Sequence, residues 1–169
     1  MRVIRLLLCG LVLVGWSLAV NAASYEALKP LLGDVADWTG EAAEGSSMDM
    51  EGVTMITASR HYQRGEERSF DAQLSLMPGA MSAVIQTEMN MNMETDQAVV
   101  TTATIDGFRV HHNHEKAQNS GDVVVILGGD DKRSAMFTMS YTGMSTQEAL
   151  AMAKRFDWKK MQAATAALH

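Results

Sequence analysis

The chain has 169 residues and a formal net charge of −6, with 20 acidic residues against 14 lysines and arginines. An acidic chain without a basic patch is poorly suited to bind nucleic acid or anionic lipid, so the sequence argues against both as partners. The single cysteine, Cys9, lies in the N-terminal segment. The rest of the chain therefore has no disulfide and no thiolate for catalysis or metal binding.

The first 22 residues have the three parts of a secretory signal peptide. Arg2 and Arg5 are positive, residues 6–14 form an apolar run, and small or medium residues precede Ala22. The apolar run is shorter than the roughly 20 residues of a membrane-spanning helix. We expect cleavage after Ala22, which leaves residues 23–169 as a single domain, periplasmic or secreted, with no membrane span.

The N-terminal part of that domain favours a short helix over 24–32, with Ser24 as its N-cap and Gly33 as its end. The polar stretch 41–47 predicts a loop or an irregular edge strand. From Met48 the hydrophobic period changes to two. The residues then alternate over 53–63 and 68–77 around a turn at 64–66, which predicts a β-hairpin.

The second half of the chain predicts a further helix over 80–88, four more strands and a C-terminal helix. Asp106-Gly107 is a strong hairpin-turn dipeptide, and Ser145 with Glu148 forms a capping box for the last helix. That helix carries an apolar stripe. The four strands are expected over 97–105, 108–114, 122–127 and 133–142.

This order of elements contains no alternating strand–helix–strand series, which argues against a doubly wound parallel sheet. We expect an α+β fold, in which a single antiparallel β-sheet has helices packed on one face. No internal repeat or linker indicates a second domain. Motifs of an enzyme active site are also missing: the chain has no G-x-S-x-G, H-E-x-x-H or P-loop pattern, so we expect a protein that is not an enzyme.

Four short motifs support a resemblance to known proteins. They are Trp38, Gly45-Ser46-Ser47-Met48, the strand 58–65 of the form A-S-R-x-Y-x-x-G, and the turn 104–108 of the form T-I-D-G-F. With them the chain resembles small exported bacterial proteins of unknown function that have a PsbP-like α+β fold. The resemblance implies a fold and an exported location, and it assigns no functional residue.

Methionine is the residue type that suggests a specific chemistry, because the chain has 14 of them. Several lie among polar residues, where core packing is not the obvious reason for their presence. A thioether is a soft, uncharged donor that selects Cu(I), and residues i and i+2 of a strand point to the same side. The candidate thioether ligands are Met48, Met50, Met89, Met91 and Met93.

The segment His111-His112-Asn113-His114 supplies a second group of candidate ligands. On a strand His112 and His114 share one face and His111 faces the other way, so the pair can chelate a metal ion. If Asp106-Gly107 is the turn, the residues opposite His111, His112 and His114 are Thr102, Thr101 and Val99. This register leaves Met93 several residues away.

These observations leave two hypotheses for function. The first is an exported, non-enzymatic binding or accessory domain that binds a soft metal ion, copper, weakly through methionine and histidine. The alternative is a protein-interaction module of a cell-envelope assembly with no small ligand, in which the methionines pack or are exposed without a specific role. The sequence names neither the envelope partner nor the oligomeric state.

Overall fold

The computed structural model describes residues 25–50, 53–79, 91–130 and 132–168. The predicted signal peptide, the N-cap Ser24 and the helix predicted over 80–88 lie outside these ranges. Within them, no helix combines the length and apolar character needed to cross a membrane.

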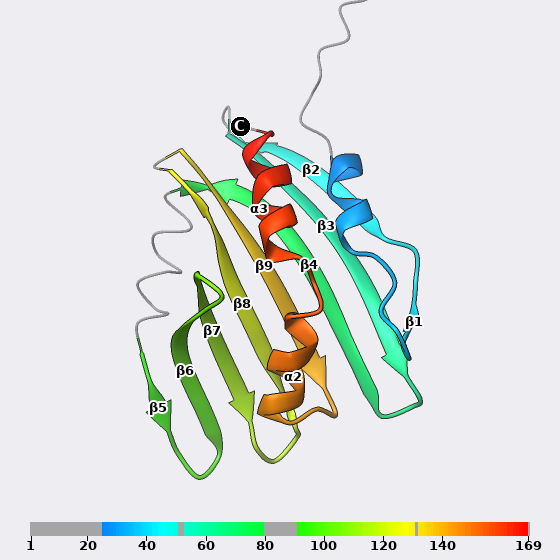
Figure 1. Ribbon diagram of the computed structural model, residues 1–169, viewed down its shortest axis with the longest axis vertical. Helices are drawn as coiled ribbons and strands as arrows, with labels where there is room; N and C mark the ends of the chain where they lie inside the picture. The colour runs from blue at the N-terminus through cyan, green and yellow to red at the C-terminus, as the bar shows by residue number, and fades with distance from the viewer. Residues whose placement is uncertain (1–24, 51–52, 80–90, 131, 169) are drawn as a thin grey trace, which may run out of the picture.

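One antiparallel sheet of nine strands dominates the fold (Figure 1). Its spatial order is β1-β3-β4-β9-β8-β7-β6-β5, and β2 pairs with β3 beside β1. The sheet therefore has β2 on one edge and β5 on the other. The strands are β1 Thr39–Gly40, β2 Glu44–Met50, β3 Val53–Arg64, β4 Arg68–Pro78, β5 Met93–Glu94, β6 Ala98–Ile105, β7 Phe108–Glu115, β8 Ser120–Gly129 and β9 Arg133–Thr142.

The predicted α+β class is wrong, because the structure is predominantly β. The described α-helices are short: α2 spans Thr146–Ala153 and α3 spans Trp158–Ala166, and the N-terminal helix is replaced by two 3₁₀ turns, η1 Tyr25–Ala27 and η2 Lys29–Leu31. The polar stretch at 41–47 contributes most of β2. Small polar residues on an edge strand show no apolar alternation, so the sequence left a loop and an edge strand as alternatives here, and the structure confirms the edge strand.

Hairpin turns set the local registers as the sequence predicts. The turn between β3 and β4 pairs Arg64 with Arg68, and the turn between β6 and β7 pairs Ile105 with Phe108. Asp106 and Gly107 both have positive φ, 51° and 88°. Positive φ at both central residues is the geometry of a type I′ turn, whose twist matches that of the flanking strands.

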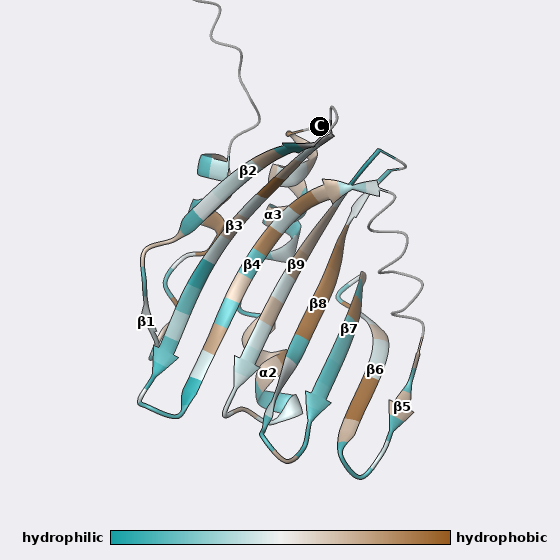
Figure 2. Cartoon of the chain, turned by 180° about the vertical axis from the view of Figure 1, so that it is seen from behind, coloured by the Kyte–Doolittle hydropathy of each residue, from teal (hydrophilic) through white to brown (hydrophobic). Residues whose placement is uncertain are grey.

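The two faces of the sheet differ in what covers them (Figures 1 and 2). The covered face carries Phe70, Leu74 and Phe137, and the described helices lie over it. The uncovered face carries the alternate residues of the same strands, such as Gln73 and Thr138, and no described helix lies in front of it in Figure 2. One hydrophobic core therefore fills the space between the covered face and the helices.

The end of β9 leads directly into α2 at one end of the core. Ser145 is the N-cap: its side chain accepts a hydrogen bond from the Glu148 backbone N–H, and the Glu148 carboxylate accepts one from the Ser145 backbone N–H at 3.0 Å. The predicted capping box is confirmed. The bonds that the Glu148 carboxylate accepts from the Ser145 backbone N–H, from Arg68 at 2.8 Å and from the Ser145 hydroxyl lower its pKa to about 2. The ionised carboxylate therefore connects α2 to β4.

Candidate functional site

The methionines proposed as ligands lie on opposite edges of the sheet. Met48 is on β2 and Met93 is on β5, and seven strand spacings separate these two strands. At about 4.8 Å per spacing, the two residues are roughly 34 Å apart, far beyond one coordination shell. Met50 ends β2, where only its backbone is described, Met91 is exposed just before β5, and Met89 lies outside the described residues.

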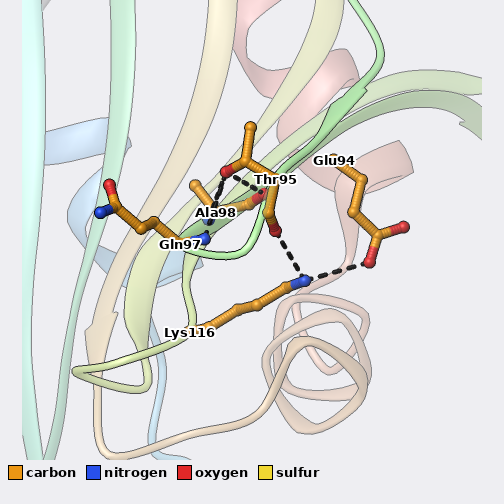
Figure 3. A network of polar contacts seen from close by, with 5 residues as sticks. All are labelled: Glu94, Thr95, Gln97, Ala98 and Lys116. Carbon is orange, nitrogen blue, oxygen red and sulfur yellow. Dashed lines mark hydrogen bonds and ion pairs between the residues drawn. The ribbon is translucent and has the colours of Figure 1, made fainter.

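Contacts around the turn between β5 and β6 hold the β5 edge in place (Figure 3). Lys116, at the end of β7, donates to the Glu94 carboxylate at 3.0 Å and to the Thr95 carbonyl at 2.8 Å. The Thr95 hydroxyl accepts from the backbone N–H of Ala98 at 3.0 Å. Met93 is thereby fixed at the edge opposite Met48.

The histidine pair has the register predicted from the turn. His111, His112 and His114 lie opposite Thr102, Thr101 and Val99 on β6. His112 and His114 face the core, and His111 is on the uncovered face. Met93 pairs with Val100, whose partner on β7 is Asn113, so Met93 is on the other face from the histidine pair. The structure therefore brings no predicted methionine on β5 to these two imidazoles.

Tyr141 occupies the position between the two imidazoles. Its hydroxyl lies 2.7 Å from Nε2 of His112 and 2.9 Å from Nδ1 of His114, and all three side chains are buried. Gly121 is the β8 residue between His114 and Tyr141, and the absence of a side chain there lets the two groups meet. One nitrogen of each imidazole proposed as a ligand is thus already used in a buried hydrogen-bond network.

His112 is neutral in this network. Its exposed fraction is 1%, and burial, followed by the nearby His114 and His111, lowers its pKa to about 4. Its Nδ1 is buried without a hydrogen-bond partner among the described residues. If Nε2 carries the hydrogen, it donates to Tyr141, which then donates to His114. In that arrangement only the lone pair of His112 Nδ1 lacks a hydrogen bond, which costs less free energy than a buried N–H without an acceptor.

A different group of methionines does come together, on the uncovered face. Met48 on β2 lies directly opposite Met55 on β3. Ile56 and Leu76 form the last pair of the ladder between β3 and β4, and extending its register by one residue places Met55 level with Met77 on β4. Met136 on β9 pairs with Ser75 and is the diagonal neighbour of Met77. We call Met48, Met55 and Met77, with Met136 beside them, the methionine row.

Burial increases along the methionine row from the edge toward the middle of the sheet. Met48 is 57% exposed, Met55 is half-buried, and Met77 and Met136 are 8% and 5% exposed. Met77 and Met136 are buried but do not belong to the core cluster. The row is therefore separate from the core and opens to solvent at Met48.

Of the methionine row, the ligand set predicted from the sequence contains only Met48, and it lacks Met55, Met77 and Met136. The signal was present in the alternation of the strands. Leu76 and Phe137 belong to the apolar face, so the adjacent Met77 and Met136 had to point to the polar one. What no pattern revealed is that β4 and β9 are neighbours, because 54 residues separate the end of β4 from the start of β9.

The geometry of the row suits a soft ion. Opposite residues of paired strands have Cβ atoms about 4.5–5.5 Å apart, and a methionine side chain has three rotatable bonds. Three thioethers from three neighbouring strands can therefore turn toward one point. Such a set of uncharged sulfur donors favours Cu(I) over Zn²⁺ or Ca²⁺, which take nitrogen, thiolate or oxygen ligands.

A second feature of the uncovered face is polar. Asp71, Ser140, Asp122 and Asn113 form a transverse line across four strands and line a shallow depression. Burial raises the pKa of Asp122, and Asp71 pairs with His61 at 2.8 Å. The strand that carries Ser140 separates the two aspartates by about 10 Å. No trio of His, Cys, Asp or Glu in the described ranges is placed to hold a metal ion.

Comparison with known proteins adds no relative: no protein-family model, curated protein or solved structure matches the chain. The resemblance to small exported proteins with a PsbP-like fold therefore stays a prediction, and the functional argument depends on the geometry of this chain alone.

Proposed function

We propose that this protein is an exported, non-enzymatic binding domain for Cu(I), and that the ion is held by the thioethers of Met48, Met55 and Met77. The observation that supports this proposal is the methionine row itself, in which neighbouring strands place these side chains level with one another on the uncovered face. Buried methionine usually belongs to a core, and here Met77 lies outside it.

The position of the row matches the requirements of a site that exchanges its ion. Met48 on the edge strand is exposed, so an ion can reach it from solvent, and Met77 is buried, so the inner end of the site excludes water. Met136, the diagonal neighbour, is a possible fourth donor. The copper proposal thus keeps Met48 from the ligand set predicted from the sequence, and Met55 and Met77 replace its other methionines.

An anaerobic Cu(I) titration against a colorimetric chelator tests the proposal. Leucine has nearly the volume of methionine and no sulfur, so the triple variant Met48→Leu/Met55→Leu/Met77→Leu should fold and melt as wild type. We expect it to lose at least tenfold in Cu(I) affinity. The matched control, Met89→Leu/Met91→Leu/Met93→Leu, removes as many sulfurs and should bind as wild type.

The pH dependence of binding distinguishes thioether from imidazole ligands. A thioether has no proton to lose, so the affinity should be nearly equal at pH 7 and pH 5. An imidazole site weakens as the pH falls through about 6.5. Equal binding by the triple variant and wild type would refute the methionine row as a site. Loss of affinity only in the control variant would show that Cu(I) binds to Met89, Met91 and Met93 instead.

A further inference from the structure

The two edges of the sheet differ in a way that bears on assembly. The β5 edge is two residues long, and Lys116 braces it through Glu94 and Thr95. The β2 edge is seven residues long and pairs one-for-one with β3 without a bulge. In the described part of the chain, β3 is the only strand that pairs with β2.

Proteins usually protect long edge strands with lysine, proline, bulges or short length, because an edge presents unpaired backbone N–H and C=O groups. β2 has none of these four devices, and its only charged residues are Glu44 and Asp49. Its sequence, Glu-Gly-Ser-Ser-Met-Asp-Met, contains no lysine, arginine or proline, and its described side chains are exposed except for half-buried Gly45. η1 contacts this strand, with the Tyr25 ring against Gly45, but among the described residues no strand pairs with the outer side of β2.

We propose that β2 pairs antiparallel with β2 of a second copy of this chain, about a two-fold axis at Ser47, and joins two sheets into one. Ser47 is the middle residue of β2, so this register is the one that pairs all seven residues. It also avoids like charges: Glu44 lies opposite the second copy's Met50, and Asp49 lies opposite its Gly45.

A shift by one residue does not work equally well. It places Glu44 opposite Asp49 of the second copy, and directly opposed like charges destabilise a strand pair. It also pairs side chains of the uncovered face with side chains of the covered face. The register about Ser47 instead keeps both uncovered faces on the same side, with Ser46 opposite the second copy's Met48.

The interface consists of one strand pair, so it is small, and the dimer should be weak and dependent on concentration. Sedimentation velocity of the purified protein from about 10 µM to about 1 mM should show a reversible monomer–dimer equilibrium. Ser47→Lys and Ser47→Asp each place like charges opposite one another at the axis and should each raise the dissociation constant at least tenfold.

Mixing the Ser47→Lys and Ser47→Asp variants tests the register itself. Opposite charges then meet at the axis, so the mixture should form a heterodimer that neither variant forms alone. Thr104→Lys adds the same charge to an exposed position on β6 and should leave the equilibrium unchanged. A monomer at every concentration, or a dimer that persists in the Ser47→Lys variant, would overturn the proposal. The readout is independent of copper.

Discussion

His112 is a buried imidazole whose protonation couples folding to pH. Its folded-state pKa of about 4 is below the ordinary value of 6.5, so the unfolded chain binds the proton more tightly. Neutral His112 therefore makes its full contribution to the unfolding free energy above about pH 6.5, and this contribution is lost as the pH falls toward 4. Each pH unit in that window corresponds to up to about 1.4 kcal/mol, so the total loss is roughly 3 kcal/mol.

Chemical denaturation at several pH values checks this prediction. His112→Leu removes the titrating group and keeps an apolar side chain in the core. Between pH 7 and pH 4 the unfolding free energy of wild type should therefore fall by more than that of this variant. His111→Gln, on the uncovered face, removes only the smallest of the three causes that lower the pKa of His112 and should retain most of the wild-type pH dependence. If His112→Leu also retains it, His112 is not the group that titrates.

Phe156 joins the last two elements to the sheet. It lies between α2 and α3, and its ring is 4.9 Å from that of Phe137, with edge-to-face contacts to Tyr62 at 6.1 Å and Phe70 at 6.3 Å. The sequence predicts a single helix over 145–156 with Phe156 on its apolar stripe. The structure instead ends α2 at Ala153 and starts α3 after the N-cap Asp157, whose carboxylate accepts from the Lys160 backbone N–H.

Truncation of that ring should destabilise the protein. Phe156→Ala leaves a cavity between the helices and three strands, so we expect a loss of about 3–5 kcal/mol in unfolding free energy. Lys159→Ala, an exposed change in the same segment, should stay within about 0.5 kcal/mol of wild type. A loss below about 1 kcal/mol for Phe156→Ala would show that the ring is not part of the core.

At the scale of the whole molecule, stability should decrease from the centre of the sheet to its edges. β4, β9 and β8 pair on both sides and contribute most of the core residues that lie on strands, whereas β2 and β5 pair on one side only. Backbone hydrogen bonds in the three central strands therefore open only on global unfolding.

Amide hydrogen exchange measures this gradient. At concentrations of a few micromolar, amides of β4, β8 and β9 should be the slowest to exchange and those of β5 among the fastest. Amides of β2 should exchange fast in dilute solution and become slower near 1 mM, where the second copy pairs with them. Uniform exchange across all strands would contradict the proposed gradient.

Turn residues and strand alternation determined the local structure of this protein. The hairpins, the faces of His112 and His114, and the capping box at Ser145 all depend on residues a few positions apart, so the sequence alone was sufficient to predict them. The exceptions among the strands are β1 and β5, which are only two residues long, and β2, whose small polar residues carry no apolar period and left a loop and an edge strand as alternatives.

The tertiary structure decided which distant segments meet. β9 pairs with β4 because both bury their apolar faces in the same core, and β5 is consequently at the far edge of the sheet. This order separates the two methionine groups seen in the sequence and assembles Met48, Met55 and Met77 instead. Pairing between strands far apart in sequence depends on shared burial rather than on turn geometry, and for that reason the local pattern did not reveal the candidate site.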